Sequence, residues 1–350
     1  MNYIKSIIKK MPIIGRILKE ISLYMQKCID LEGELGTLRI SLNECSTNLL
    51  FHINLCKKLL EVYEIKPVLS IESSSDSSRK KMGAFNCTPE DYKSLCEKNK
   101  NELSIFSLKR YCLLCQRADE MFVDYQHALE DSFGNKIPNL REKISCQHCH
   151  MNNRQRLIAY LAAGLINKYQ FKDVYLTEYI TPIYSWIKKK FPNSAIEGSE
   201  YLSGDLNSGN IVNGVMHQDI MATSFGDDSF DLIISNDIFE HVPDPLMAFK
   251  ECLRILRTGG YLIATIPFNK DLEKSIQRAK LFEGQIVNIL PAQFHNNPVS
   301  EDGALVFYDY GWDLIDLMKS AGFSNVKIDV YSDDIFGHFG EPISIFIASK

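Results

Sequence analysis

Residues 230–268 constrain the fold more than any other part of this 350-residue chain. The apolar run 232–234 is typical of a buried parallel strand. Asp244 is suited to cap a following helix, and the glycine pair at 259–260 is expected to end that helix. A second apolar run covers 261–266. The stretch therefore predicts a strand, a helix and a parallel strand, the repeating unit of a sheet covered by helices on both faces.

Polar residues follow the first of these strands directly. Ser235, Asn236 and Asp237 come at its carboxyl end. In open sheets of this kind, ligands bind outside the carboxyl ends of the strands. We therefore expect this strand end to face a ligand.

Three sequence stretches, FDLII, EHVPDP and RILRTGG, resemble the hallmark of the class I S-adenosylmethionine-dependent methyltransferases. The one departure is Thr258, where proline is common. The resemblance covers about residues 155–350. It implies an α/β fold with a doubly wound, Rossmann-like sheet that binds S-adenosylmethionine.

The resemblance also implies cofactor-binding roles at successive strand ends. Glu178 matches the acid after the first strand, and Glu200 matches the acid that accepts hydrogen bonds from both ribose hydroxyls. Such double acceptance suits a carboxylate. Asp219 matches the acid near the adenine, and Asn236 and Asp237 complete the cofactor-binding set.

The loop after the first strand contains no glycine. It reads EYITPIY, whereas the family uses glycines here to let the backbone approach the methionine part of the cofactor. Ile180 and Pro182 prevent that close approach. Two interpretations remain open: a loop that bends differently and still binds the cofactor, or a disabled site in a scaffold protein.

Two CxxC pairs, Cys112 with Cys115 and Cys146 with Cys149, lie upstream. Four thiolates form the tetrahedral set of a structural zinc site, so the spacing predicts a zinc-ribbon-like module. The alternatives are a chance pattern or a disulfide framework. The junction CQHCHMNNRQRL resembles that of a narrower bacterial group, found among surface-polysaccharide genes, in which a two-CxxC module precedes the methyltransferase fold.

The sequence pattern predicts four consecutive regions in the chain. Residues 1–65 are expected to form a helical arm, 66–106 a linker, 107–152 the zinc-ribbon-like module and 153–350 the methyltransferase domain. Within the arm, 1–22 has the pattern of a basic amphipathic helix, for which we weigh contact with a membrane surface against packing on the protein itself. Residues 31–59 carry a coiled-coil-like heptad seam that is either intramolecular or homo-oligomeric.

Net charge and hydrophobic pattern limit the classes of function and the cellular location that we expect. The net charge of −5 gives no strong nucleic-acid signal. No apolar run suited to span a bilayer and no signal peptide are apparent, which favours the cytoplasm, with peripheral attachment to the inner face of the membrane left open. We expect methyl transfer to an oxygen or nitrogen of a sugar or other small molecule, with His241, Asp237 and His295 as catalytic candidates. An inactive scaffold and an RNA methyltransferase are the alternatives.

Overall fold

The structure is a computed structural model. It describes residues 65–72, 89–99, 103–126, 128–131, 134–297 and 299–350, together with Lys19, Leu23 and Leu49. The membrane-surface prediction for 1–22 and the oligomer prediction for 31–59 fall on segments outside these residues. Among the described helices, none is both long and apolar enough to cross a membrane.

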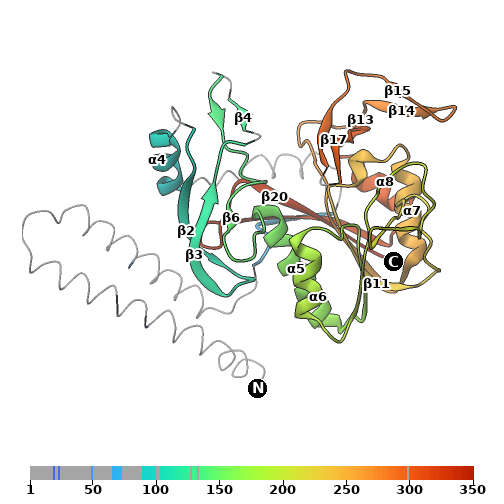
Figure 1. Cartoon of the computed structure of the whole chain (residues 1–350), viewed down its shortest axis with the longest axis horizontal. Helices are drawn as coiled ribbons and strands as arrows, with labels where there is room; N and C mark the ends of the chain where they lie inside the picture. Colours follow the sequence, from blue (N-terminus) through green and yellow to red (C-terminus); the bar gives the residue numbers. More distant parts are fainter. Residues whose placement is uncertain are drawn as a thin grey trace, which may run out of the picture.

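A seven-stranded mixed sheet forms the centre of the described chain (Figure 1). Its strands, in spatial order, are β1 (Leu69–Ile71), β19 (Asn325–Asp333), β20 (His338–Ser349), β12 (Leu256–Thr265), β11 (Phe230–Asn236), β7 (Asp173–Leu176) and β8 (Ala195–Gly198). β12, β11, β7 and β8 are parallel, whereas β20 runs antiparallel to both of its neighbours. The carboxyl ends of the four parallel strands therefore meet at one edge.

Helices cover both faces of this sheet, as the sequence predicted. They are α5 (Asn153–Tyr169), α6 (Pro182–Lys190), α7 (Pro245–Ile255) and α8 (Leu314–Ser320). Along β11, Leu232 and Ile234 join the core that α5 and α6 cover, while Ile233 joins the core that α7 and α8 cover. Alternate side chains of a strand point to opposite faces, and the result is a Rossmann-like, three-layer fold.

The upstream module is a separate small sheet beside the central one (Figure 1). It contains β2 (Phe106–Cys112), β3 (Arg117–Val123) and β6 (Ser145–Cys146), with β4 (Leu129–Glu130), β5 (Lys136–Ile137) and α4 (Glu90–Asn99) around it. The structure differs from the expected 66–106 linker, because β1 adds to the edge of the central sheet and α4 is helical.

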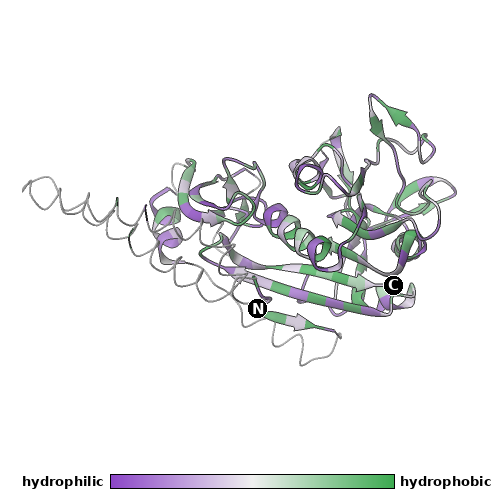
Figure 2. Ribbon diagram, turned by 90° about the horizontal axis from the view of Figure 1, so that it is seen from below, coloured by the Kyte–Doolittle hydropathy of each residue, from purple (hydrophilic) through white to green (hydrophobic). Residues whose placement is uncertain are grey.

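Short pairs of antiparallel strands lie outside these two sheets. They comprise β9 (Ile211–Val212) with β10 (Val215–Met216), β13 (Ile276–Gln277) with β18 (Tyr308–Asp309), β14 (Ala279–Phe282) with β15 (Gln285–Asn288), and β16 (Phe294–Asn297) with β17 (Ser300–Leu305). Hydrophobic colour follows the buried central strands and recurs on the projecting β14–β15 hairpin (Figure 2). That hairpin exposes Leu281, Phe282, Ile286 and Val287.

Two local predictions were wrong. The glycine pair does not end a helix: α7 ends at Ile255, and Gly259 and Gly260 lie inside β12. A Cβ at Gly260 would lie 2.9 Å from the carbonyl oxygens of Arg257 and Asp231, so the register shift between β11 and β12 requires glycine there. Asp219 was expected to follow a strand of its own, but the strand before it is reduced to a single parallel bridge, Glu200 with His217.

Candidate functional site

The carboxyl edge of the parallel strands gathers the polar side chains that the sequence singled out. Glu178 follows β7, Glu200 follows β8, and Asn236 ends β11; all three are nearly buried. Asp219 lies two residues beyond His217, the bridge partner of Glu200. The strand order therefore brings together residues that are up to 58 positions apart in sequence.

Glu200 holds the glycine-free loop. The backbone N–H groups of Tyr179 and Ile180 donate to its Oε1 at 2.7 and 2.9 Å. In the part of the chain that the structure describes, no hydrogen bond engages its Oε2. The loop thus bends around a carboxylate, and one oxygen of that carboxylate remains for a ligand.

The loop lacks a glycine that would allow close backbone approach, but the neighbouring strand β8 supplies one. Gly198 ends β8, and a Cβ there would lie 2.7 Å from the ring of Tyr184 and 3.1 Å from the carbonyl oxygen of Glu178. Tyr184 comes from α6, whose first residue is Pro182. A glycine one strand away therefore lets α6 and the loop pack closely on β8, a feature that inspection of the loop alone missed.

Glu178 and Asn236 form a buried pair. The Asn236 amide donates to Glu178 Oε1, and the Thr265 hydroxyl donates to Asn236 Oδ1 at 3.2 Å. Burial raises the pKa of Glu178 to about 7, opposed by the nearby Arg154 guanidinium. Near neutral pH both the protonated and the charged form of this carboxyl are therefore populated.

Asp237 is held by two arginines. Both terminal nitrogens of Arg141 donate to its carboxylate at 2.7 Å, and Arg154 Nε lies 3.2 Å away. Arg154 also pairs with Glu142 at 2.9 and 3.0 Å. The arginines hold the pKa of Asp237 well below its usual range, despite burial. Asp237 thereby links the central sheet to the segment that contains Arg141, a role that sequence reasoning missed.

The residues of the NNRQR stretch begin helix α5 and connect it to its surroundings. Asn152 caps α5 through a capping box with Gln155. The buried Arg156 donates to the carbonyl oxygens of Phe336 at 2.7 Å, Gly337 at 2.8 Å and Ile144 at 3.2 Å. The arginines of this stretch therefore join the module to the sheet.

Two of the three catalytic candidates come together. The rings of His241, from the 3-10 turn η1 (Phe239–His241), and His295, from β16, lie 5.0 Å apart and perpendicular to each other. Each ring has a nitrogen 3.4 Å from Oε1 of the fully buried Glu240. The nearby Glu240 carboxylate raises the pKa of His295. We call Glu240, His241 and His295 the Glu240 cluster.

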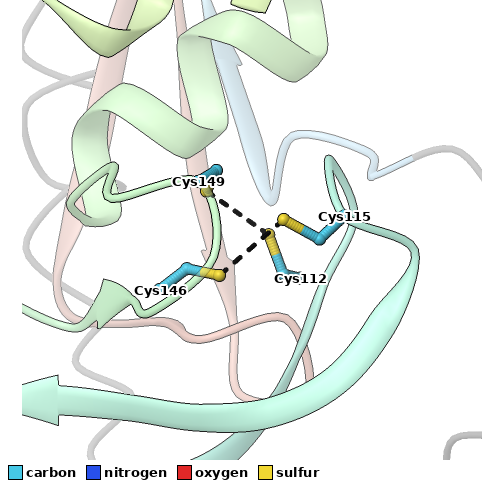
Figure 3. A group of neighbouring side chains, drawn as sticks. All are labelled: Cys112, Cys115, Cys146 and Cys149. Carbon is cyan, nitrogen blue, oxygen red and sulfur yellow. Dashed lines mark hydrogen bonds between the residues drawn. The ribbon is translucent and has the colours of Figure 1, made fainter.

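The four paired cysteines converge, as Figure 3 shows. Their sulfur atoms lie within 4.8 Å of one another, with Cys112 to Cys149 at 3.9 Å and Cys115 to Cys146 at 3.8 Å. A tetrahedral zinc with Zn–S bonds of about 2.3 Å separates its sulfur ligands by about 3.8 Å. The cluster is compatible with a structural zinc ion.

A surface hollow of about 470 Å³ lies between the start of α7 and α8 and is lined in part by Tyr308 and Tyr310. It contains none of the strand-end acids, so it is distinct from the expected cofactor site. Tyr310 donates to the Phe239 carbonyl oxygen at 2.7 Å, and Trp312 is fully buried.

Comparison with known families agrees with this geometry. Residues 163–264 match the family model described as a methyltransferase domain. The chain contains a methyltransferase domain over these residues. The matched segment begins in α5 and ends near the end of β12, so it includes Glu178, Glu200, Asp219 and Asn236. A search of curated proteins found no match to this chain.

Several solved structures are similar to the chain. An S-adenosylmethionine-dependent methyltransferase from Mesorhizobium loti is 14% identical with a TM-score of 0.32, and covers 51% of this chain and 91% of its own. A "possible histamine N-methyltransferase" from Thermotoga maritima is 20% identical (TM-score 0.30; 56% and 93%). A 1,6-didemethyltoxoflavin-N1-methyltransferase from Burkholderia thailandensis is 13% identical (TM-score 0.34; 56% and 77%). Similarities of this size say nothing about a substrate of this chain.

Proposed function

We propose that the chain transfers the methyl group of S-adenosylmethionine to an oxygen or nitrogen of a small-molecule acceptor. The observation that carries this proposal is the pairing of Glu178 with Asn236 beside Glu200, at the carboxyl edge of a sheet with methyltransferase connectivity. Buried acids of this kind have little structural reason to gather unless a ligand meets them.

Each strand-end acid then has a separate role. Glu178 faces the amino group of the cofactor, the free Oε2 of Glu200 accepts from the ribose, and Asp219 lies toward the adenine. Asn236 keeps Glu178 in place. Asp237 is a positioning residue, because Arg141 and Arg154 already engage its carboxylate.

The Glu240 cluster is the part of the domain suited to the acceptor. Methyl transfer from a sulfonium is an in-line displacement, so the protein chiefly aligns the two reactants and removes a proton from the acceptor. His241 and His295 are the titratable groups beside Glu240 that remain partly accessible. A sugar is our preferred acceptor class, in line with the resemblance to proteins of surface-polysaccharide genes.

The cysteine module has a structural role in this proposal. Cys112, Cys115, Cys146 and Cys149 would hold one zinc ion, and four thiolates leave no open position for chemistry. The ion would fix the segment that carries Arg141 against Asp237. Zinc would thus support the cofactor edge of the sheet from outside.

The test is a transfer assay with methyl-labelled S-adenosylmethionine. The purified full chain is incubated with nucleotide sugars, with free amino sugars and, separately, with RNA. The proposal expects label in the sugar fractions and a large loss of transfer in His241→Ala. Label in RNA alone would favour the RNA methyltransferase alternative, and cofactor binding without transfer to any acceptor would favour the scaffold.

A further inference from the structure

We propose that the Glu240 cluster binds a divalent transition-metal ion, a second metal site distinct from the cysteine cluster. This inference rests on the proposed function, because it assigns the metal to the acceptor side of the same site. Glu240, His241 and His295 each offer one ligand atom, and these atoms lie within 4.8 Å of one another.

The burial of the Glu240 carboxylate is the first observation that favours a metal ion. Its side chain is 0% exposed, and among the described residues neither carboxylate oxygen has a hydrogen-bond partner; the ring nitrogens of His241 and His295 lie 3.4 Å from Oε1. A buried carboxylate without hydrogen bonds is costly and rare in native proteins. A bound cation at this position would satisfy it.

The position of the ring proton on His241 is the second observation that favours a metal ion. Its Nδ1 lies 2.8 Å from the Leu305 carbonyl oxygen. A carbonyl only accepts, so Nδ1 carries the proton, and in the neutral ring Nε2 presents a lone pair toward Glu240 Oε1. A ring N–H bonded to a backbone carbonyl is also the usual way in which a protein orients a metal-binding histidine.

The distances between the three possible ligand atoms are the third observation that favours a metal ion. Both histidine nitrogens lie 3.4 Å from Glu240 Oε1, beyond the usual length of a hydrogen bond. Zinc bonds to nitrogen and oxygen of about 2.1 Å place two tetrahedral ligands about 3.4 Å apart. Two histidines and one glutamate are a known catalytic zinc set that keeps a position open. The His295 side chain is 36% exposed, so the cluster opens on that side.

The open position suits an acceptor hydroxyl. With His241 and His295 bound to the metal, neither serves as the base; a metal-bound hydroxyl instead loses its proton to solvent at a lower pH than a free one. The resulting oxygen anion attacks the methyl carbon and forms the new O–C bond. The C–S bond breaks, its electron pair stays on sulfur, and S-adenosylhomocysteine leaves.

Cobalt titration of the full chain tests the site. We expect two Co²⁺ ions per chain: one with thiolate-to-metal charge-transfer absorption, lost in Cys146→Ser, and one without it. The second ion should bind about a hundredfold more weakly in Glu240→Gln and in His295→Ala. Phe294→Ala is the matched control, because Phe294 is a neighbouring β16 residue that is 57% exposed; it should bind both ions.

The outcomes separate this inference from the proposed function. His295→Ala guards against misfolding of Glu240→Gln, since its side chain is partly exposed; circular dichroism checks both variants. One ion per chain in the wild type, or unchanged binding of the second ion in folded His295→Ala, would overturn the metal site. S-adenosylhomocysteine binding, measured on the same samples, tests the proposed function independently.

Discussion

Replacing Asp237 with Asn should destabilise the chain strongly, because the carboxylate is the shared partner of two arginines. The substitution preserves shape and φ, which is 51° at this residue and suits Asn. It removes the charge that accepts two 2.7 Å bonds from Arg141 and lies 3.2 Å from Arg154. Removing one member of a buried ion pair costs about 3–5 kcal/mol.

We expect the lower end of that range, about 3 kcal/mol, because the Arg141 side chain is 30% exposed. For a domain of this size, such a loss lowers the melting temperature by about 6–12 °C. Urea unfolding, followed by circular dichroism, measures the free energy directly. Asp228→Asn is the matched control: its ion pair with Lys350 is on the surface, with Asp228 57% exposed, and should contribute less than about 1 kcal/mol.

The pH dependence gives an independent check. The folded pKa of Asp237 is lowered below its unfolded value of about 3.9, so the stabilisation is complete above that value and is lost as pH falls below it. The difference between wild type and Asp237→Asn should therefore be constant from about pH 5 to 7 and shrink in stronger acid. Equal stability of the two proteins at pH 7 would refute the reasoning.

Three further predictions concern the module and the cofactor edge. Metal analysis of Cys146→Ser should find the zinc of the cysteine module lost, and full retention would eliminate that site. Because burial raises the pKa of Glu178 to about 7, its charged form grows as pH rises from 6 to 8, and affinity for the cofactor's amino group should rise up to about tenfold. Titrations at several pH values should find this rise absent in Glu178→Gln. Gly198→Ala should cost about 1–3 kcal/mol in urea unfolding, because its Cβ would meet Tyr184 at 2.7 Å, and an unchanged midpoint would contradict the close approach.

The sequence predicted the parts of the fold that depend on local pattern. The strand β11, the Asp244 cap of α7 and the convergence of the CxxC pairs follow from apolar runs, capping chemistry and spacing. The prediction that the glycine pair ends a helix was wrong because these glycines are required by a register shift between β11 and β12. No local sequence pattern predicts such a shift.

The candidate site was less predictable, because its contacts join distant segments. Asp237 was assigned to the cofactor and to catalysis, yet its partner Arg141 is 96 residues away in sequence. His241 and His295 were both singled out, but Glu240 between them was not. Glu240 lies between Phe239 and His241 in a connection with several polar residues, so nothing in the sequence marks it, and only the fold reveals that its carboxylate is buried.

The central claim is that the glycine-free edge of the sheet still binds the cofactor, with Glu200 serving both loop and ribose. Calorimetric titration of wild type and Glu200→Gln with S-adenosylhomocysteine tests it directly. Gln keeps an oxygen for the N–H groups of Tyr179 and Ile180 and removes the charged acceptor. We predict binding to wild type and affinity about tenfold to hundredfold weaker in the variant, from about 1.5–3 kcal/mol for hydrogen bonds to a charged group. No binding to folded wild type at millimolar ligand, or equal affinity of the two proteins, would contradict the account.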